Sequence, residues 1–286
     1  KYVLSGEIRS GGFGTIYTGY ALRDLSPVAF KKIMKTNVTQ WEDSDCRMPK
    51  EIAIMQRLQY VPHIIQLLDW HEDDEAFLIV MEQPDPCKDL FEYITDRGFL
   101  PENEARVLFT QALVTFMQMY GKYVYHRDIK SENILTTTDS SGNIILKFID
   151  FGAANYVSEE PFKRSDGTIL YSPPETFSGH RYNGYPEAIW SLGILLYELT
   201  SGCLPFENEQ EIRLGNYSFD NSLHLSNPLK KLISSLLDPD PNKRPDYDQI
   251  LFHPWMISQE NDCEEASSIM ASGFSSDLTS RYIKQL

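Results

Sequence analysis

The sequence predicts an α+β fold, with a sheet formed by the first part of the chain and a larger helical region after it. Residues 1–8 and 15–20 alternate apolar and polar positions around a glycine-rich turn, which is typical of a β-hairpin. Residues 101–120 and 188–201 instead carry apolar side chains at helical spacing. Together these patterns predict strands first and buried helices later.

The composition is that of a globular protein. The chain has 286 residues, of which 42% are hydrophobic, enough for two modest domains or one large two-lobed unit. With 26 basic and 41 acidic residues, its net charge of −15 argues against nucleic-acid binding and favours a basic partner, although an acidic surface that only keeps the protein soluble explains it equally well. Four cysteines without zinc spacing fit a cytoplasmic protein, with the nucleus as a second compartment, and no apolar run is long enough for a membrane span.

Further strand and helix signals follow the hairpin. The run that ends at Lys31 predicts a third strand, and runs at 63–70 and 76–81 predict an antiparallel pair. Pro49 stands at a favoured helix start, so Glu51 is expected in the first turn of a helix. The helix at 101–120 is expected to bury one face, and the helix at 188–201 to be buried all round.

The chemically informative residues form three separate motifs. Residues 125–133 read Tyr-His-Arg-Asp-Ile-Lys-Ser-Glu-Asn and set an acid, a cation and an amide on one loop. Asp150-Phe151-Gly152 follows an apolar run, and Val28-Ala29-Phe30-Lys31 ends an earlier one. In this order the motifs resemble the signature set of eukaryotic protein kinases over residues 1–257.

This resemblance implies the two-lobed protein kinase fold, with a small β-rich N-lobe containing one main helix and a larger helical C-lobe. The N-lobe with its Gly-rich loop is expected at 1–83, and the C-lobe with catalytic loop and activation segment at 84–257. Residues 258–286 are serine-rich and acidic and are expected to form a tail. The chain is similar to the Pim serine/threonine kinases through its hinge at 82–86, the stretch 89–98 and Ser172-Pro173-Pro174-Glu175.

The kinase resemblance also implies a role for each polar residue of the motifs. Asp128 would orient or accept the proton of the substrate hydroxyl, and Lys130 would steady the γ-phosphate of ATP. Asn133 and Asp150 would hold Mg²⁺. Lys31 would bind the α- and β-phosphates and pair with Glu51. The nucleotide site is expected to comprise Ile8, Gly11, Gly12, Phe13, Gly14, Ile16, Ala29, Lys31, Met81, Glu82, Asp89 and Leu135.

The expected activity is transfer of the ATP γ-phosphate to serine or threonine, the acceptor class that Lys130 indicates by resemblance. Asp89, Glu92 and Glu132 lie where Pim-like kinases present acids to arginines ahead of the acceptor. The expected partners are therefore protein substrates with basic residues near the acceptor, bound by a monomeric enzyme.

Two other classes of protein compete with this interpretation. A pseudokinase, which binds nucleotide or partners without catalysis, is supported by two departures from the kinase pattern. Arg9 replaces the first glycine of the Gly-rich loop, and Ala188 stands where most kinases carry an aspartate that braces the catalytic loop. A small-molecule kinase is disfavoured by the complete stretch from Thr168 to Glu175, which resembles a peptide platform.

Three further expectations concern charge pairing, the hinge and the activation segment. Glu175 is expected to pair with Arg244, and Pro84 has no N–H to offer adenine. Arg127 meets a phosphate in many kinases, and a buried guanidinium without a counter-charge is costly. Glu159 and Glu160 are expected to supply carboxylates instead, so that the segment orders unphosphorylated; the alternative is phosphorylation of Ser158 or Ser165.

Overall fold

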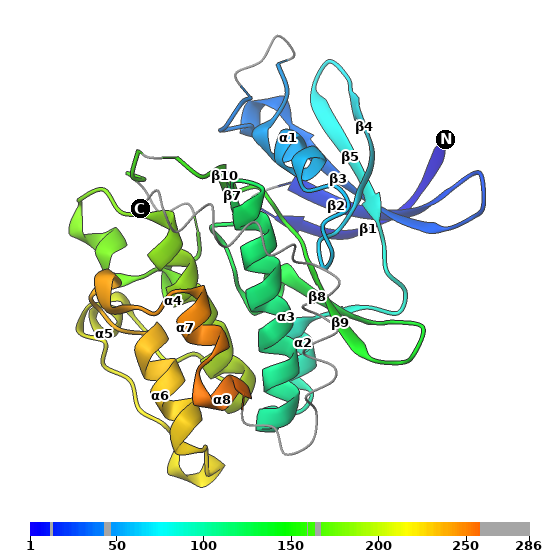
Figure 1. Ribbon diagram of the computed structural model, residues 1–286. Helices are drawn as coiled ribbons and strands as arrows, with labels where there is room; N and C mark the ends of the chain where they lie inside the picture. The colour runs from blue at the N-terminus through cyan, green and yellow to red at the C-terminus, as the bar shows by residue number, and fades with distance from the viewer. Residues whose placement is uncertain (12–13, 43–46, 159, 164–166, 258–286) are drawn as a thin grey trace.

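A computed structural model describes residues 1–11, 14–42, 47–158, 160–163 and 167–257 (Figure 1). Several residues expected to matter lie outside these ranges, namely Gly12, Phe13, Glu159, Ser165 and the tail 258–286. No helix within the described ranges is long and apolar enough to cross a membrane. The predicted α+β class is confirmed, with a sheet followed by a mostly helical region.

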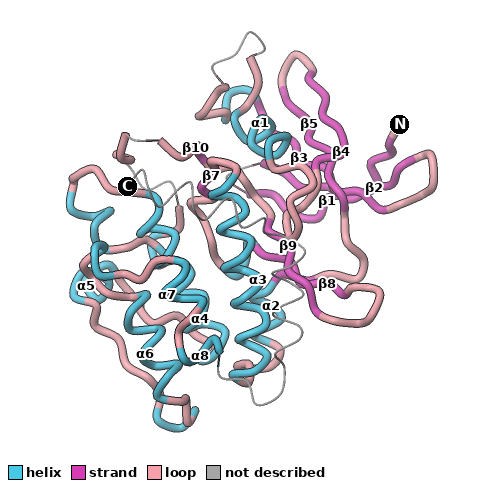
Figure 2. Tube along the Cα trace, in the orientation of Figure 1, coloured by secondary structure: helices cyan, strands magenta, loops and turns pink. Residues whose placement is uncertain are grey.

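The N-terminal region is a five-stranded antiparallel sheet with one helix beside it (Figure 2). The strand order is β1-β2-β3-β5-β4. The sheet consists of β1 (Tyr2–Gly11), β2 (Gly14–Ala21), β3 (Pro27–Met34), β4 (Leu67–Glu72) and β5 (Ala76–Glu82). The helix α1 (Lys50–Arg57) begins directly after Pro49, as the sequence predicts.

The strand expected to start at His63 begins instead at Leu67. His63 has a positive φ of 60°, which ends any regular extension there. Its carbonyl accepts from the amide of Phe148, and the amide of Ile65 donates to the carbonyl of Phe148. This segment therefore bonds to β9 (Ile144–Phe148), beyond the N-terminal sheet.

The helical region is built around two long helices, α3 (Glu102–Gly121) and α4 (Gly184–Ser201). Every residue of α4 from Glu187 to Thr200 is buried, which confirms the prediction from its all-round apolar pattern. Around them lie α2 (Leu90–Thr95), α5 (Glu209–Leu214), α6 (Asn227–Leu236), α7 (Tyr247–Leu251) and α8 (Pro254–Ile257).

Short strands and single helical turns carry the residues of the sequence motifs. The loop after β7 (Val124–Tyr125) leads through the 3-10 turn η2 (Ser131–Asn133) into β8 (Ile134–Thr138), which pairs with β9. Further short pieces are β6 (Lys88–Asp89), β10 (Asn155–Tyr156) and the single turns η1 (Lys35–Asn37), η3 (Ile169–Tyr171), η4 (Pro174–Ser178), η5 (Asn221–Leu223) and η6 (Pro241–Lys243). Figure 1 shows β8 and β9 beside α3 and below the N-terminal sheet, so the motifs meet where the two regions join.

Candidate active site

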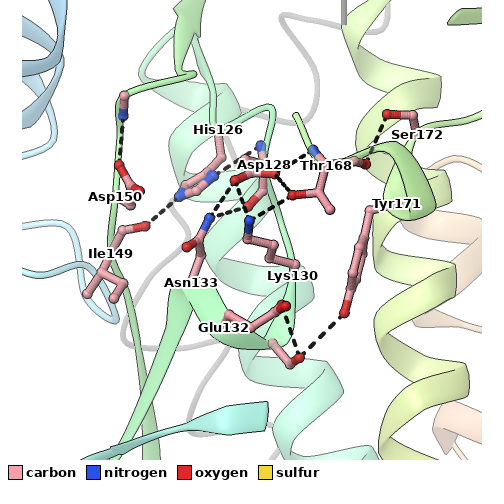
Figure 3. A network of polar contacts seen from close by, with 12 residues as sticks. His126, Asp128, Lys130, Glu132, Asn133, Ile149, Asp150, Thr168, Tyr171 and Ser172 are labelled. Carbon is pink, nitrogen blue, oxygen red and sulfur yellow. Dashed lines mark hydrogen bonds and ion pairs between the residues drawn. The ribbon is translucent and has the colours of Figure 1, made fainter. Parts of the chain in front are cut away.

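Asp128 lies at the centre of a buried polar network (Figure 3). Its Oδ1 accepts from the backbone N and the hydroxyl of Thr168, both at 2.9 Å. Its Oδ2 accepts from Asn133 Nδ2 at 2.7 Å and lies 3.0 Å from Lys130 Nζ. The carboxylate is thus held in one orientation by four contacts from two segments of the chain.

Lys130 and Thr168 connect the expected catalytic loop, residues 125–133, to the end of the expected activation segment, residues 153–168. Lys130 Nζ donates to the Thr168 hydroxyl at 2.7 Å, and this hydroxyl donates to Asp128. The close approach requires Gly167, because a Cβ at that position would lie 2.5 Å from the carbonyl oxygen of Arg127. Thr168 is a site residue that was not predicted, although the Asp-Gly-Thr sequence ahead of the Pro-Pro-Glu stretch is a signal that could have found it.

The backbone around the site is held in uncommon conformations. Arg127 and Asp150 both have positive φ, 65° and 61°, which costs free energy for residues other than glycine. His126 stabilises the arrangement, because its Nε2 lies 3.0 Å from the Ile149 carbonyl and its Nδ1 accepts from the Asp128 amide. Burial lowers the pKa of His126, so its neutral form is favoured.

Lys31 forms the second cluster of the site, together with Glu51 and Asp150. Its Nζ lies 2.6 Å from Glu51 Oε1 and 2.8 Å from Asp150 Oδ1, so the predicted pair with Glu51 is present. Burial alone would lower the pKa of Lys31, but the two carboxylates outweigh it and raise that pKa. Burial likewise opposes ionisation of Asp150, yet Lys31 keeps the Asp150 pKa below its usual value.

The chemistry of Asn133 and Asp150 suits a hard cation. Asn133 uses its NH₂ group for the carbonyl and carboxylate oxygens of Asp128, which leaves its amide oxygen directed away from Asp128. Asp150 is ionised because its pKa is lowered. Magnesium takes oxygen ligands and usually needs only one or two protein carboxylates beside phosphate oxygens. Within the described ranges no group of three His, Cys, Asp or Glu residues forms a ready metal site.

The described apolar residues expected at the nucleotide site lie on five strands, β1, β2, β3, β5 and β8. Ala29 of β3 is paired with Met81 of β5, and Leu135 lies on β8. Ile16 of β2 is half-buried, whereas Ile8 of β1 is exposed. Gly11 and Gly14 pair at the end of the hairpin, and Gly14 is required because a Cβ there would lie 2.4 Å from the Lys32 carbonyl oxygen.

Two residues expected at the nucleotide site use their side chains for structure. The carboxylate of Glu82 accepts a hydrogen bond from Lys147 Nζ at 2.7 Å and another from the backbone N–H of Gln66 at 2.9 Å. Asp89 caps α2 by accepting from the Glu92 amide at 2.7 Å. Only the second carboxylate oxygen of Asp89 therefore remains for a ribose or a peptide. Because α2 packs against η2, Asp89, Glu92 and Glu132 belong to neighbouring elements.

Among the described residues, Arg127 has a counter-charge in Glu187, which the sequence did not reveal. Its guanidinium lies 3.6 Å from the carboxylate of Glu187 and donates to the Tyr182 hydroxyl at 2.7 Å. The ring of Phe162 lies over it at 4.0 Å. The expectation for Glu160 was wrong, because that side chain is exposed and lies 3.8 Å from Arg181. The sequence does not indicate that Glu187 pairs with Arg127. Glu187 lies just before an apolar helical run, where an acid is usually solvent-exposed.

Glu187 belongs to the most deeply buried acids of the described chain and is 4% exposed. Burial raises its pKa to about 7, against the opposing pull of Arg127. The activation segment reaches this cluster through Phe162, whose amide and carbonyl pair with those of Tyr182. A separate ion pair, Glu175 with Arg244 at 2.6 Å, confirms the one expected from the sequence and fixes η4.

Comparisons with known proteins agree with this geometry. A family model described as "Protein kinase domain" matches residues 2–256. The chain is similar to serine/threonine-protein kinase pim-2 of Danio rerio, with 38% identity over 95% of this chain and 91% of that protein. It is 40% identical to serine/threonine-protein kinase prk-2 of Caenorhabditis elegans over 91% of this chain and 59% of that protein. Serine/threonine-protein kinase PSK1 of Saccharomyces cerevisiae is 39% identical over 73% of this chain and 16% of that protein.

Proposed function

Since the chain belongs to the serine/threonine protein kinase family, we propose that it is an active enzyme that phosphorylates serine or threonine preceded by basic residues. Membership of this family implies that ATP is the phosphate donor. The observation that carries the proposal is the Asp128 network, in which one carboxylate is oriented by Lys130, Asn133 and Thr168 together. Phosphoryl transfer depends mainly on such positioning and on charge neutralisation.

Each cluster of the site has a part in the proposed reaction. Asp128 orients the acceptor hydroxyl and takes its proton, while Lys130 neutralises charge on the transferring phosphoryl group. Lys31, held by Glu51, binds the α- and β-phosphates. Asn133 and Asp150 would hold magnesium, which neutralises phosphate charge when it is bound. Ala29, Met81 and Leu135 provide the apolar lining for adenine, and the N-lobe and C-lobe meet near residue 83.

The competing proposal is a pseudokinase that binds nucleotide without catalysis. Arg9 and Ala188 favour it, but the complete set of contacts around Asp128 and Lys31 supports catalysis. The two proposals are distinguished by measuring ATP binding and phosphate transfer on one preparation of the protein. We expect ATP with Mg²⁺ to raise the melting temperature and labelled phosphate to appear on a serine peptide. Stabilisation without any transfer would support the pseudokinase.

We expect arginine or lysine upstream of the acceptor to be preferred, because Asp89, Glu92 and Glu132 gather beside the catalytic loop. Pairs between arginine and carboxylate are the strong kind of charge-assisted hydrogen bond. A positional peptide library measures this preference directly, and Glu92→Gln should weaken it at one peptide position. Glu209→Gln on α5 is the matched control. A library with no basic preference, or with an acidic one, would count against the proposal.

We also expect activity without phosphate on the activation segment, because Glu187 already supplies a carboxylate to Arg127. The protein should be expressed with a phosphatase, and mass spectrometry should establish that Tyr156, Ser158 and Ser165 are unmodified. Peptide phosphorylation should then be close to that of the untreated enzyme. Glu187→Gln should lower it roughly tenfold, because the buried Arg127 guanidinium would lose a counter-charge. Negligible activity that returns when Ser158 or Ser165 gains phosphate would refute this expectation.

A further inference from the structure

The helix α1 carries Glu51 and is contacted at both of its ends by the short strand β10. Lys50, the first residue of α1, donates through its Nζ to Asn155 Oδ1 at 3.2 Å. Arg57, the last residue of α1, has its guanidinium carbon 5.2 Å from the centre of the Tyr156 ring. Asn155 and Tyr156 therefore touch the helix on a side that does not face the Lys31 cluster.

The Tyr156 side chain lies along one face of α1. The helix has 8 residues, so its first and last residues are almost two turns apart and lie on the same face. The Tyr156 ring is 5.9 Å from Lys50 Nζ and 5.2 Å from the Arg57 guanidinium, distances at which an aromatic ring attracts a cation. The Tyr156 hydroxyl donates to Glu42 Oε2 at 2.8 Å, in the segment that leads into α1. One side chain thus contacts both ends of the helix and the segment before it.

The same contacts extend to the strand that leads into the catalytic loop. Strand β10 pairs with β7, where Tyr156 lies opposite Val124. Arg57 also lies over the ring of Tyr123 at 5.8 Å, and the carbonyl of Tyr123 accepts from the amide of Val157 at 2.9 Å. Figure 1 shows β10 and β7 side by side between α1 and α3. Two tyrosines from neighbouring segments therefore both contact Arg57.

The position of α1 has to come from such contacts with its neighbours. A helix of two turns has little stability of its own, so packing decides where it lies. Burial and the bond to Glu42 raise the pKa of Tyr156 to about 12, so the hydroxyl stays protonated and remains a donor. Arg57 is exposed and Tyr156 is half-buried, so these contacts add little to the core and act mainly on the placement of the helix.

We propose that Tyr156 is a positioning residue that holds α1, and Glu51 with it, in the place where Glu51 meets Lys31. The proposal rests on the proposed kinase function and adds a determinant of ATP use that lies outside the nucleotide site. Loss of the Tyr156 side chain releases the outer face of α1, so Glu51 is paired with Lys31 in fewer molecules. ATP use should suffer, whereas the peptide site at α2 and η2 keeps its geometry.

The test compares Tyr156→Ala, Tyr156→Phe and Arg57→Met in steady-state phosphorylation of an arginine-containing serine peptide. We expect kcat/KM for ATP to fall roughly threefold to tenfold in Tyr156→Ala and in Arg57→Met, the size that loss of cation–π contacts implies. KM for the peptide should not change. Tyr156→Phe keeps the ring beside both cations and should retain most of the activity that Tyr156→Ala loses. Tyr60→Ala is the matched control, because Tyr60 follows α1 and is 86% exposed.

A double-mutant cycle with Glu51→Gln tests whether Tyr156 acts through Glu51. This change weakens the pair with Lys31 directly, so Tyr156→Ala should cause little further loss in the Glu51→Gln background. Equal losses in both backgrounds overturn the proposal, as does a Tyr156→Ala variant with wild-type kcat/KM for ATP. A matching rise in peptide KM, or a lower active fraction alone, also overturns it by showing a general structural role. If Tyr156→Ala does not fold, Arg57→Met completes the same cycle at an exposed position. A wild-type protein without any transfer would instead contradict the proposed function.

Discussion

Replacing Asp128 by asparagine is expected to lower kcat for peptide phosphorylation by roughly 10² to 10⁴, the range of general-base contributions. Asparagine keeps the shape but loses the charge and the basicity of the carboxylate. It also sets an NH₂ group among donors, because Thr168, Asn133 and Lys130 all point hydrogens at this side chain. The variant should therefore lose some stability as well, of the order of 1–3 kcal/mol.

The stability loss must be separated from the catalytic one. Asp139→Asn is the matched control, because the Asp139 carboxylate likewise accepts hydrogen bonds, here from two backbone N–H groups, but lies in an exposed turn. The Asp128 variant should still bind ATP, which a thermal shift measures. Turnover of the two variants is then compared at a temperature at which both are folded. Turnover by Asp128→Asn close to that of the Asp139 variant would show that Asp128 does not perform the proton transfer.

Replacing Lys31 by methionine is expected to lower kcat/KM for ATP by roughly 10² to 10³, the cost of removing one preorganised electrostatic donor. The change also leaves Glu51 and Asp150 close together without the cation between them. Because Pro84 offers no N–H, adenine gains less from the hinge and the phosphates must contribute more. Measured nucleotide affinity should therefore fall together with turnover.

Lys32→Met provides the control for this experiment. Lys32 is the next residue of β3, so its side chain points to the opposite face of the sheet. The Lys32→Met variant should keep a kcat/KM for ATP close to that of the wild type. Equal losses in the two variants would mean that the strand was damaged rather than the phosphate site. A Lys31 variant with unchanged ATP affinity would contradict the assignment of Lys31 to the phosphates.

Some contacts of the folded protein could be predicted from the sequence, namely those between two residues that both belong to kinase motifs. Lys31 with Glu51 and Glu175 with Arg244 were expected because each partner stands in a recognisable motif. The all-round apolar pattern of α4 likewise predicted its burial. The strand predicted to start at His63 begins only at Leu67 for a physical reason. The apolar neighbours of His63 are buried against β9, and the spacing of apolar residues in the sequence cannot show which strand they contact.

The missed residues share a different property. Glu187 is a buried acid in a mostly apolar helix, and sequence alone does not show whether such an acid faces solvent or a buried partner. Its role depends on Arg127, which is far away in the chain and reaches α4 only in the folded protein. Thr168 was missed for the same reason, since its contact with Asp128 spans 40 residues.

The most direct test is phosphate transfer itself, measured on the purified wild-type protein. The protein is incubated with γ-labelled ATP, Mg²⁺ and an arginine-rich serine peptide, and the product is identified by mass spectrometry. We predict phosphoserine on the peptide, transfer that stops when Mg²⁺ is chelated, and loss of most activity in Asp128→Asn. Protein that binds ATP but leaves serine and threonine peptides unmodified, or transfer that persists at full rate in Asp128→Asn, would contradict the central claim.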